Sequence, residues 1–329
     1  MNSSEKVCPL QLPWHTSFYG IPSIVKSSKA ALITHSITFP FTILLNALVF
    51  VCIWRKNSLQ TNTNILLASL AVTDLMVGCL AQPLFITEEY FKLKGELNCN
   101  VGMAYSCVQF LVCGASLTHI VPITLERYIA IKYPLKSSIW ITKRSLMVVI
   151  TMSWLIAISA FALTILGYTT NLQVYKLMRD ITGAVTLLIS AILIGFCYSA
   201  ILRISIRQKK KCLNILTRSN ATREERKRQI RENKAAKTTA IVVGMFFLSY
   251  TSATAFMVAV LIHPEPSTST VMFALLTWSR TLVLLTSPAN PVVYCCRSNE
   301  FRKAIKGMIF KRGSSVEMTS RRGRADVSW

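Results

Sequence analysis

Seven long apolar segments constrain the fold of this chain more than any other feature of its sequence. Such a segment needs about 20 mostly apolar residues to cross the hydrocarbon core of a bilayer, which is about 30 Å thick. Helix is the expected conformation, because lipid offers no partner for backbone N–H and C=O groups. The sequence therefore predicts an all-α protein, a bundle of seven transmembrane helices. The seven spans, numbered in chain order, lie at about 31–54, 64–87, 101–131, 146–168, 181–206, 236–262 and 270–295.

The distribution of basic residues predicts how these spans are oriented. The formal net charge of +23 is, taken alone, compatible with nucleic-acid binding. Most Lys and Arg residues, however, lie between the fifth and sixth spans and after the seventh, and few lie on the side of the N-terminus. Basic loops stay in the cytoplasm, where they are also attracted to anionic membrane lipid. We therefore expect a multi-pass plasma-membrane protein with an extracellular N-terminus and no nucleic-acid partner.

Little of the chain is left outside the spans. The expected organisation is an extracellular N-terminal segment at 1–30, a seven-helix domain at 31–310 and a disordered cytoplasmic tail at 311–329. Asn2 begins a glycosylation sequon on the predicted outer side. The sequence contains no legible nucleophile–base pair or metal-ligand spacing, so we do not expect an enzyme. It also lacks the internal repeats of a secondary transporter and the charged ring of a channel.

Polar residues interrupt the apolar spans at a few positions. Asn46, Asp74 and Asn290 lie in the middle of the first, second and seventh spans. The motif Glu126-Arg127-Tyr128 lies at the inner end of the third span. Any one of these residues could simply join two helices by hydrogen bonds. Because ionisable and polar groups are costly inside a bilayer, several of them in this order indicate a functional interior.

This set of residues resembles the rhodopsin-like family of G-protein-coupled receptors. The similar motifs are the Asn of the first span, Leu-Ala-x-x-Asp at 70–74, Glu-Arg-Tyr at 126–128, Trp154, and Asn-Pro-x-x-Tyr at 290–294. Residues 299–305 are similar to the family's short amphipathic eighth helix, with Phe301 and Ile305 able to face lipid. The resemblance implies a receptor that transmits an extracellular ligand signal to a heterotrimeric G protein through outward movement of the sixth span.

The resemblance also implies where the switch lies. Arg127 would be restrained by Glu126 and, across the bundle, by Glu232, because an ion pair in a partly desolvated groove biases a two-state equilibrium. Glu232 could instead be a solvated charge in a stretch rich in Arg, Lys and Glu. The residues assigned to the switch and to G-protein coupling are Glu126, Arg127, Tyr128, Tyr198, Glu232, Asn290, Pro291 and Tyr294.

Four polar residues match the pocket that binds a sodium ion in this family, and this ion would be the one non-protein component of the receptor. They are Asp74, Ser116, Ser287 and Asn290. A carboxylate buried in the membrane needs a counter-charge, and oxygen ligands suit a hard monovalent cation. A water-filled polar cluster without a fixed ion is the alternative, and no other cofactor is expected.

The ligand pocket that the resemblance implies contains one unusual charge, Arg280. Gln109 stands where amine receptors carry an Asp, and Leu284 stands where opsins carry a lysine, so neither an ammonium ion pair at Gln109 nor retinal is expected. Arg280 could bind an anionic group of the ligand, or it could pair internally with Glu88 or Glu89. The pocket residues are Gln109, Cys113, Tyr250, Thr254, Met257 and Arg280, and the type of ligand stays open.

The sequence departs from the family pattern in the fifth and sixth spans. Tyr250 and Ser252 replace the usual Trp and Pro of the sixth span, and Ser190 replaces the Pro of the fifth. Helices without these prolines keep their backbone hydrogen bonds and bend less. A second interpretation therefore stays open, in which a non-signalling, receptor-like membrane protein binds or escorts a partner.

Two further features concern the ends of the molecule. The family joins the outer end of the third span to the following outer loop by a disulfide, but the loop at 169–179 contains no cysteine. Cys99 could pair with Cys8, since both face an oxidising compartment, or both could be free thiols. The tail contains Ser and Thr residues that phosphorylation could turn into an arrestin site, or it could be a plain polar tail.

Overall fold

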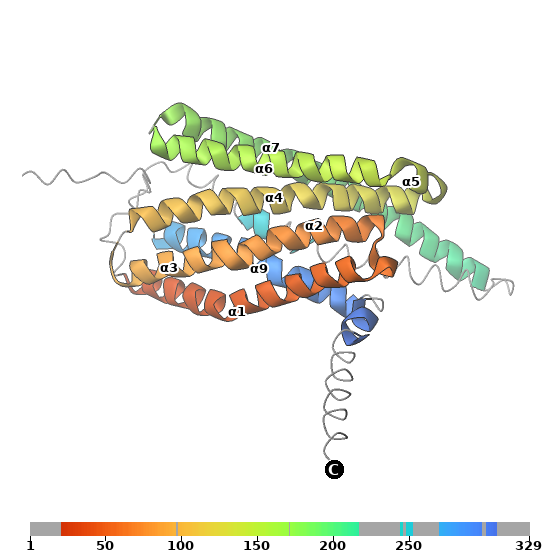
Figure 1. Cartoon of the computed structure of the whole chain (residues 1–329), viewed down its shortest axis with the longest axis horizontal. Helices are drawn as coiled ribbons and strands as arrows, with labels where there is room; N and C mark the ends of the chain where they lie inside the picture. Colours follow the sequence, from red (N-terminus) through yellow and green to blue (C-terminus); the bar gives the residue numbers. More distant parts are fainter. Residues whose placement is uncertain are drawn as a thin grey trace, which may run out of the picture.

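The fold consists of long helices, and none of the described residues forms a strand (Figure 1). The computed structural model describes residues 21–96, 98–170, 172–216, 244–245, 248–252, 270–297 and 301–307. The elements are α1 (Pro22–Arg55), η2 (Asn57–Leu59), α2 (Asn62–Met76), η3 (Val77–Ala81), α3 (Gln82–Leu93), α4 (Cys99–Lys132), α5 (Pro134–Trp140), α6 (Lys143–Thr169), α7 (Gln173–Leu216) and α9 (Thr270–Arg297). Residues 301–307 are also helical.

The helices match the predicted spans closely. Among the described residues, five helices are long and apolar enough to cross a membrane: Pro22–Arg55, Asn62–Leu93, Cys99–Lys132, Lys143–Thr169 and Leu177–Ile204. These correspond to the first five predicted spans, and α9 occupies the seventh. Of the sixth predicted span, only residues 244–245 and 248–252 are described, and they are helical.

Two helices are longer than the apolar segments that predicted them. α1 begins at Pro22 rather than near residue 31, and proline suits the first helical turn because its missing N–H has no helical partner there. α7 continues to Leu216, well past the predicted end near residue 206. Hydropathy marks where the membrane begins and ends, whereas a helix can continue into water with charged side chains.

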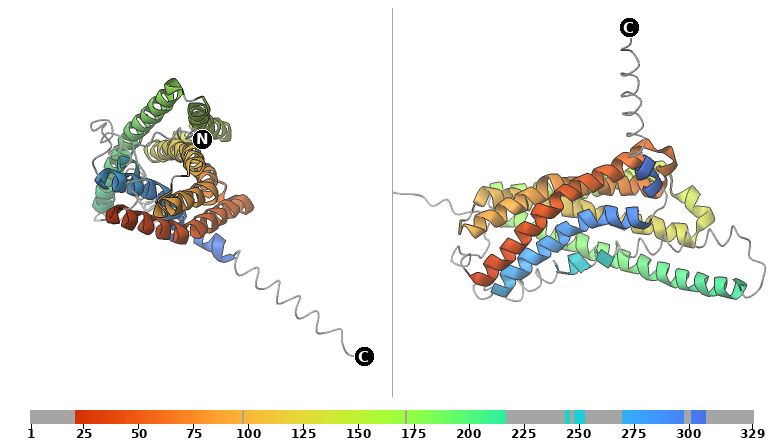
Figure 2. Two further views of the ribbon diagram at one scale, coloured as in Figure 1. Left: turned by 90° about the vertical axis from the view of Figure 1, so that its left-hand side faces the viewer. Right: turned by 90° about the horizontal axis from the view of Figure 1, so that it is seen from below.

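α4 lies at the centre of the bundle. It contacts α2, α3, α6 and α7, while α1 packs against α2, α3 and α9. The end-on view in Figure 2 shows the other helices arranged around α4. Near the N-terminal ends of α1 and α4, on the side predicted to be the outer one, the core includes Ala31, Phe85 and Tyr105. The inner half includes Val49 and Ile120.

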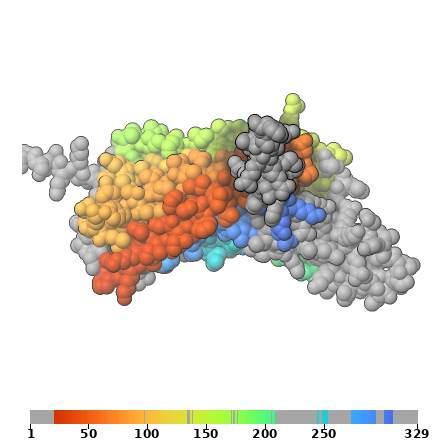
Figure 3. Space-filling model, turned by 60° about the horizontal axis from the view of Figure 1, so that its bottom comes forward, coloured from red at the N-terminus to blue at the C-terminus, as the bar shows by residue number. Residues whose placement is uncertain are grey.

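The outward faces of the helices are strongly apolar. On α6, Met147 and Leu155 are 58% and 53% exposed, and on α7 Leu188 is 62% exposed. A soluble protein rarely exposes an apolar patch this extensive, whereas a bilayer accommodates it. Figure 3 shows the bundle as a long body with α1 running along one side, as expected for helices that span a membrane together.

A π-helical turn joins α2 to α3 and adjusts the direction of the outer half of the second span. Pro83 cannot donate a backbone hydrogen bond, and the N–H of Gln82 reaches the C=O of Val77, five residues back. A Cβ on Gly78 would lie 2.8 Å from Cγ1 of Ile43 and 3.3 Å from its backbone N. The turn therefore lies directly against α1.

The eighth helix corrects one expectation. Phe301 is only 3% exposed and packs in the inner core with Cys52 and Leu59, and Ile305 packs against the same cluster. The prediction that Phe301 faces lipid is therefore wrong. The sequence identified an apolar helix face correctly, but the nearby ends of α1 and η2 cover that face before lipid can.

Candidate functional site

The inner end of α4 holds Arg127 beside a carboxylate that also contacts α2. Nε of Arg127 lies 3.0 Å from Oε2 of Glu126. The hydroxyl of Thr63 donates to Oε1 of Glu126 over 2.8 Å. Glu126 is 9% exposed, whereas the Arg127 side chain is 24% exposed. Glu126 therefore links α2 to Arg127, a contact that the sequence did not indicate.

The other predicted switch residues are only partly described. Tyr128 accepts a hydrogen bond from Nζ of Lys132 over 2.6 Å, and its ring lies 6.1 Å from that of Phe196 on α7. Tyr198 packs against the inner core. Pro291 is buried in α9. Glu232 and the side chain of Tyr294 lie outside the described residues.

A buried polar cluster in the middle of the bundle joins three helices. Nδ2 of Asn290 donates to Oδ2 of Asp74 over 2.9 Å, and the buried side chain of Ser287 lies beside this carboxylate. Nδ2 of Asn46 donates to the backbone C=O of Ser287 over 3.1 Å. Ser116 extends the cluster to α4, since its hydroxyl lies 3.2 Å from that of Thr73. The structure thus brings Asp74, Ser287 and Asn290 together. It places Ser116 beside Thr73, the residue that precedes Asp74.

Two oxygens of this cluster are suited to a cation. Oδ1 of Asp74 and Oδ1 of Asn290 are buried and have no hydrogen-bond partner among the described residues. Buried acceptors of this kind are costly unless a donor or cation satisfies them. In the described part of the chain, no group of three or more His, Cys, Asp or Glu side chains is arranged to hold a metal ion.

Tyr250 contacts the central helix directly. Its hydroxyl donates to the backbone C=O of Cys113 over 2.9 Å, so these two predicted pocket residues meet. Gln109 is partly buried, one turn further out on α4. Thr254 and Met257 lie outside the described residues. The aromatic side chain that replaces the usual Trp is thus hydrogen-bonded to the backbone of α4.

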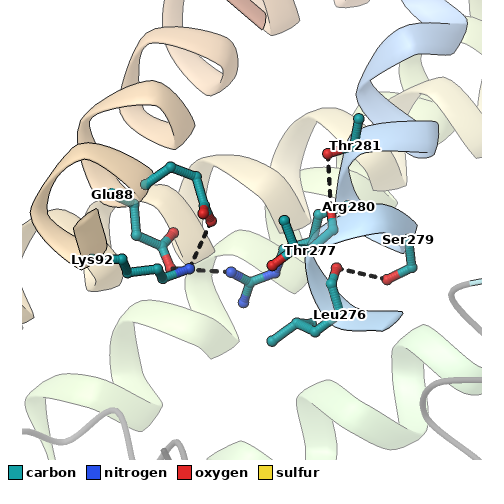
Figure 4. Close-up of polar contacts among 8 residues, drawn as sticks. Glu88, Lys92, Leu276, Thr277, Ser279, Arg280 and Thr281 are labelled. Carbon is teal, nitrogen blue, oxygen red and sulfur yellow. Dashed lines mark hydrogen bonds and ion pairs between the residues drawn. The ribbon is translucent and has the colours of Figure 1, made fainter. Parts of the chain in front are cut away.

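Arg280 is paired within the protein. Its Nη1 lies 3.1 Å from Oε1 of Glu88, and Nζ of Lys92 lies 2.9 Å from the same oxygen (Figure 4). Lys92 also lies 2.8 Å from Oε1 of Glu89. This geometry agrees with the internal ion pair that the sequence left open for Arg280. Lys92 was missed, although its spacing from Glu88 and Glu89 predicts one shared helix face.

Tyr105 and His119 are further buried polar residues that the sequence analysis did not select. The guanidinium of Arg280 lies 5.2 Å from the ring centroid of Tyr105, which is fully buried. On the opposite half of α4, Nε2 of His119 lies 2.8 Å from the hydroxyl of Ser69, and its ring lies 5.6 Å from that of Trp154. Trp154 therefore packs against a polar contact between α2 and α4.

Cys99 is disulfide-bonded at the outer end of α4. Its partner is not Cys79, Cys107, Cys113 or Cys197, whose side chains are free thiols. Cys8 and the sequon residue Asn2 lie outside the described residues.

Comparison with known proteins agrees with the resemblance seen in the sequence. A family model described as "7 transmembrane receptor (rhodopsin family)" matches residues 45–294. The human histamine H2 receptor is 27% identical over 303 residues, which cover 85% of this chain and 80% of that receptor. The octopamine receptor beta-2R of Chilo suppressalis is 24% identical, with 86% and 82% covered. Trace amine-associated receptor 1 of Mus musculus is 28% identical, with 83% and 88% covered. With the polar residues of its spans arranged as described above, the chain belongs to the rhodopsin family of seven-transmembrane receptors and is a G-protein-coupled receptor, not an enzyme.

Proposed function

We propose that this receptor transmits the binding of an extracellular ligand to a heterotrimeric G protein through outward movement of the sixth span. It would do so in the plasma membrane, with its N-terminus outside the cell. The observation that supports this most strongly is the contact between Arg127 and Glu126 at the inner end of α4. Glu126 is anchored to α2 by Thr63, so Arg127 is held at the inner opening of the bundle.

The strength of this restraint suits a switch. Oε2 of Glu126 lies close to Arg127 but forms no hydrogen bond of good geometry among the described residues. The Arg127 side chain is also partly open to the cytoplasmic side of the bundle, and such ion pairs contribute only about 1 kcal/mol or less. Glu232 would add a second partner from the sixth span. Loss of that partner on outward movement would free Arg127, with Tyr198 and Tyr294 supporting the open state.

A sodium ion bound at Asp74 would favour the resting arrangement. The unpartnered oxygens of Asp74 and Asn290 support such a site, and Ser287 and Ser116 would supply hydroxyl ligands. The ion would supply positive charge to a buried carboxylate, while the protein residues hold α2 and α9 at a fixed separation.

The outer and inner segments complete the proposal. Cys8 is the expected partner of Cys99, because Cys212, Cys295 and Cys296 belong to the opposite, inner ends of α7 and α9. The N-terminal segment at 1–30, with a glycan on Asn2, would be extracellular. The basic inner segments would contact anionic lipid, and the tail at 311–329 would bind arrestin after phosphorylation.

Ligand-independent G-protein activation tests the proposal without knowledge of the ligand. We expect Glu126→Gln to raise basal G-protein activation in cells, because the neutral side chain restrains Arg127 less. Arg127→Ala should abolish both this increase and the response to any agonist. Lys143→Ala, at the first turn of α6, is a control for removal of an inner positive charge. If Glu126→Gln and Arg127→Ala reach the cell surface and neither alters activation of any G-protein class, the non-signalling alternative is preferred.

A further inference from the structure

Four ionised side chains form a buried, charge-balanced network between α3 and α9. Glu88, Glu89 and Lys92 are 8%, 0% and 7% exposed, and the Arg280 side chain is 11% exposed. Two carboxylates face two cations, so the formal charge of the network is zero. We call these four residues the outer charge network. Figure 4 shows Arg280 reaching from α9 toward Glu88 and Lys92 on α3.

The network has unused hydrogen-bonding capacity, and most of it consists of acceptors. Oε2 of Glu88, Oε2 of Glu89 and the hydroxyl of Tyr105 are buried and have no hydrogen-bond partner among the described residues. Tyr105 is a separate element of the site, because it comes from α4 and lies under the guanidinium of Arg280. The ring of Phe85 packs against the ring of Tyr105, with 5.4 Å between the two ring centroids. Buried acceptors without partners are costly, so a ligand that donates hydrogen bonds to them gains free energy.

The cations of the network retain donors as well. Arg280 donates to Glu88 through Nη1 alone among the described contacts, although a guanidinium has five N–H donors. Its planar fork can hold a carboxylate in a bidentate arrangement. Within the described part of the chain, the site therefore offers both carboxylate and hydroxyl oxygens without partners and guanidinium N–H groups that are not used.

Charge balance selects between ligand classes. A ligand that carries only an ammonium group would leave a buried net charge of plus one, and a ligand that carries only a carboxylate would leave minus one. Unbalanced charge is costly in a poorly solvated interior. A zwitterion adds both groups and keeps the site neutral.

We propose that the outer charge network recognises a small zwitterionic ligand of the amino-acid type. The ammonium group binds the free oxygens of Glu88 and Glu89 with the hydroxyl of Tyr105, and the carboxylate binds Arg280. This inference rests on the proposed receptor function and specifies the ligand of the same protein. It separates this receptor from its relatives, whose names are those of amine receptors, and it is consistent with Gln109 in place of an acidic residue on α4.

Thermal unfolding of the purified receptor in nanodiscs tests ligand recognition independently of G-protein coupling. The probes are the twenty amino acids at millimolar concentration, each with its decarboxylated amine and its deaminated acid. One matched set is tyrosine, tyramine and 3-(4-hydroxyphenyl)propionate, and another is histidine, histamine and 3-(imidazol-4-yl)propionate. We expect at least one amino acid to raise the Tm while its amine and its acid do not. The proposal is overturned if an amine or an acid raises the Tm more than its amino acid, or if no amino acid raises it.

Two variants sharpen this test. Tyr105→Phe should not lower the Tm of the ligand-free receptor, because the lost hydroxyl has no partner among the described residues, but it should weaken amino-acid binding. Arg280→Gln leaves the network with a net charge of minus one, so it should weaken amino-acid binding by about 30-fold or more and shift preference toward the matched amine. Ser279→Ala is the control on the same helix, since among the described residues its hydroxyl bonds to the C=O of Leu276 alone.

The two proposals fail in different ways. Arg127→Ala should keep the amino-acid-induced rise in Tm and lose G-protein activation. Binding without activation in the unmodified receptor would refute the signalling proposal alone. Activation by an amine with no effect of any amino acid would refute the zwitterion proposal alone. An unchanged preference in Arg280→Gln would also refute it.

Discussion

Replacement of Lys92 by Met should destabilise this receptor more than replacement of Arg280 by Met. Lys92 contacts the carboxylates of Glu88 and Glu89: its Nζ lies 2.9 Å from Oε1 of Glu88 and 2.8 Å from Oε1 of Glu89. Without Lys92, the fully buried Glu89 has no ion-pair partner among the described residues. Without Arg280, each carboxylate still has Lys92.

The expected magnitude follows from this difference. Removal of one partner of a buried ion pair typically costs about 3–5 kcal/mol, because the other charge is left without compensation. Lys92→Met should fall in this range, while Arg280→Met should cost about half as much or less. Glu89→Gln combined with Lys92→Met should recover a large part of the loss, because it removes the stranded charge.

The measurement is thermal unfolding of each purified variant in nanodiscs without ligand, with Ser279→Ala as the control. The double-mutant cycle of Lys92 and Glu89 gives their coupling directly. If Arg280→Met proved more destabilising than Lys92→Met, or if Glu89→Gln gave no recovery, Lys92 would not be the residue that neutralises this site.

Three further predictions follow from single contacts. Gly78→Ala should destabilise the receptor by about 1–3 kcal/mol in the same unfolding assay, because the new Cβ would lie 2.8 Å from a side-chain carbon of Ile43. An unchanged Tm would show that the π-helical turn can move away from α1. Thr63→Val should raise ligand-free G-protein activation about fivefold, because Glu126 loses a hydrogen bond worth about 1 kcal/mol. Basal activity equal to that of the unmodified receptor would contradict a restraining role for this contact. Phe301→Ala should lower stability by about 3–5 kcal/mol, since the ring is only 3% exposed, whereas a lipid-facing side chain would tolerate the change with little loss of Tm.

Much of the candidate site could be predicted because its residues are exceptional within their own segments. Asp74 and Asn290 are polar residues in apolar spans, and in the structure Nδ2 of Asn290 lies 2.9 Å from Oδ2 of Asp74. Arg127 follows Glu126 directly, so their proximity needs no knowledge of the fold. Trp154 and Pro291 were identified in the same way, from motifs confined to one span each.

The parts that could not be predicted depend on how the helices are rotated relative to one another. Helical periodicity places Glu88 and Lys92 on one face of α3, but it does not say that Arg280 of α9 faces them. Tyr250 was expected in the pocket, yet its bond to the backbone of α4 depends on the exact approach of two helices. Phe301 shows the same limit, because an apolar helix face does not reveal whether lipid or protein covers it.

By itself, the sequence determined the number of spans, their order and their expected orientation, since bilayer thickness and the cost of unpaired backbone groups act on each segment separately. Only the tertiary structure decided which buried charges meet. Glu88 and Arg280 are far apart in the chain, and α1, which packs against both α3 and α9, helps to bring them together. The physical reason is that burial in a membrane is a property of a segment, whereas neutralisation of a buried charge requires a partner that packing between helices must supply.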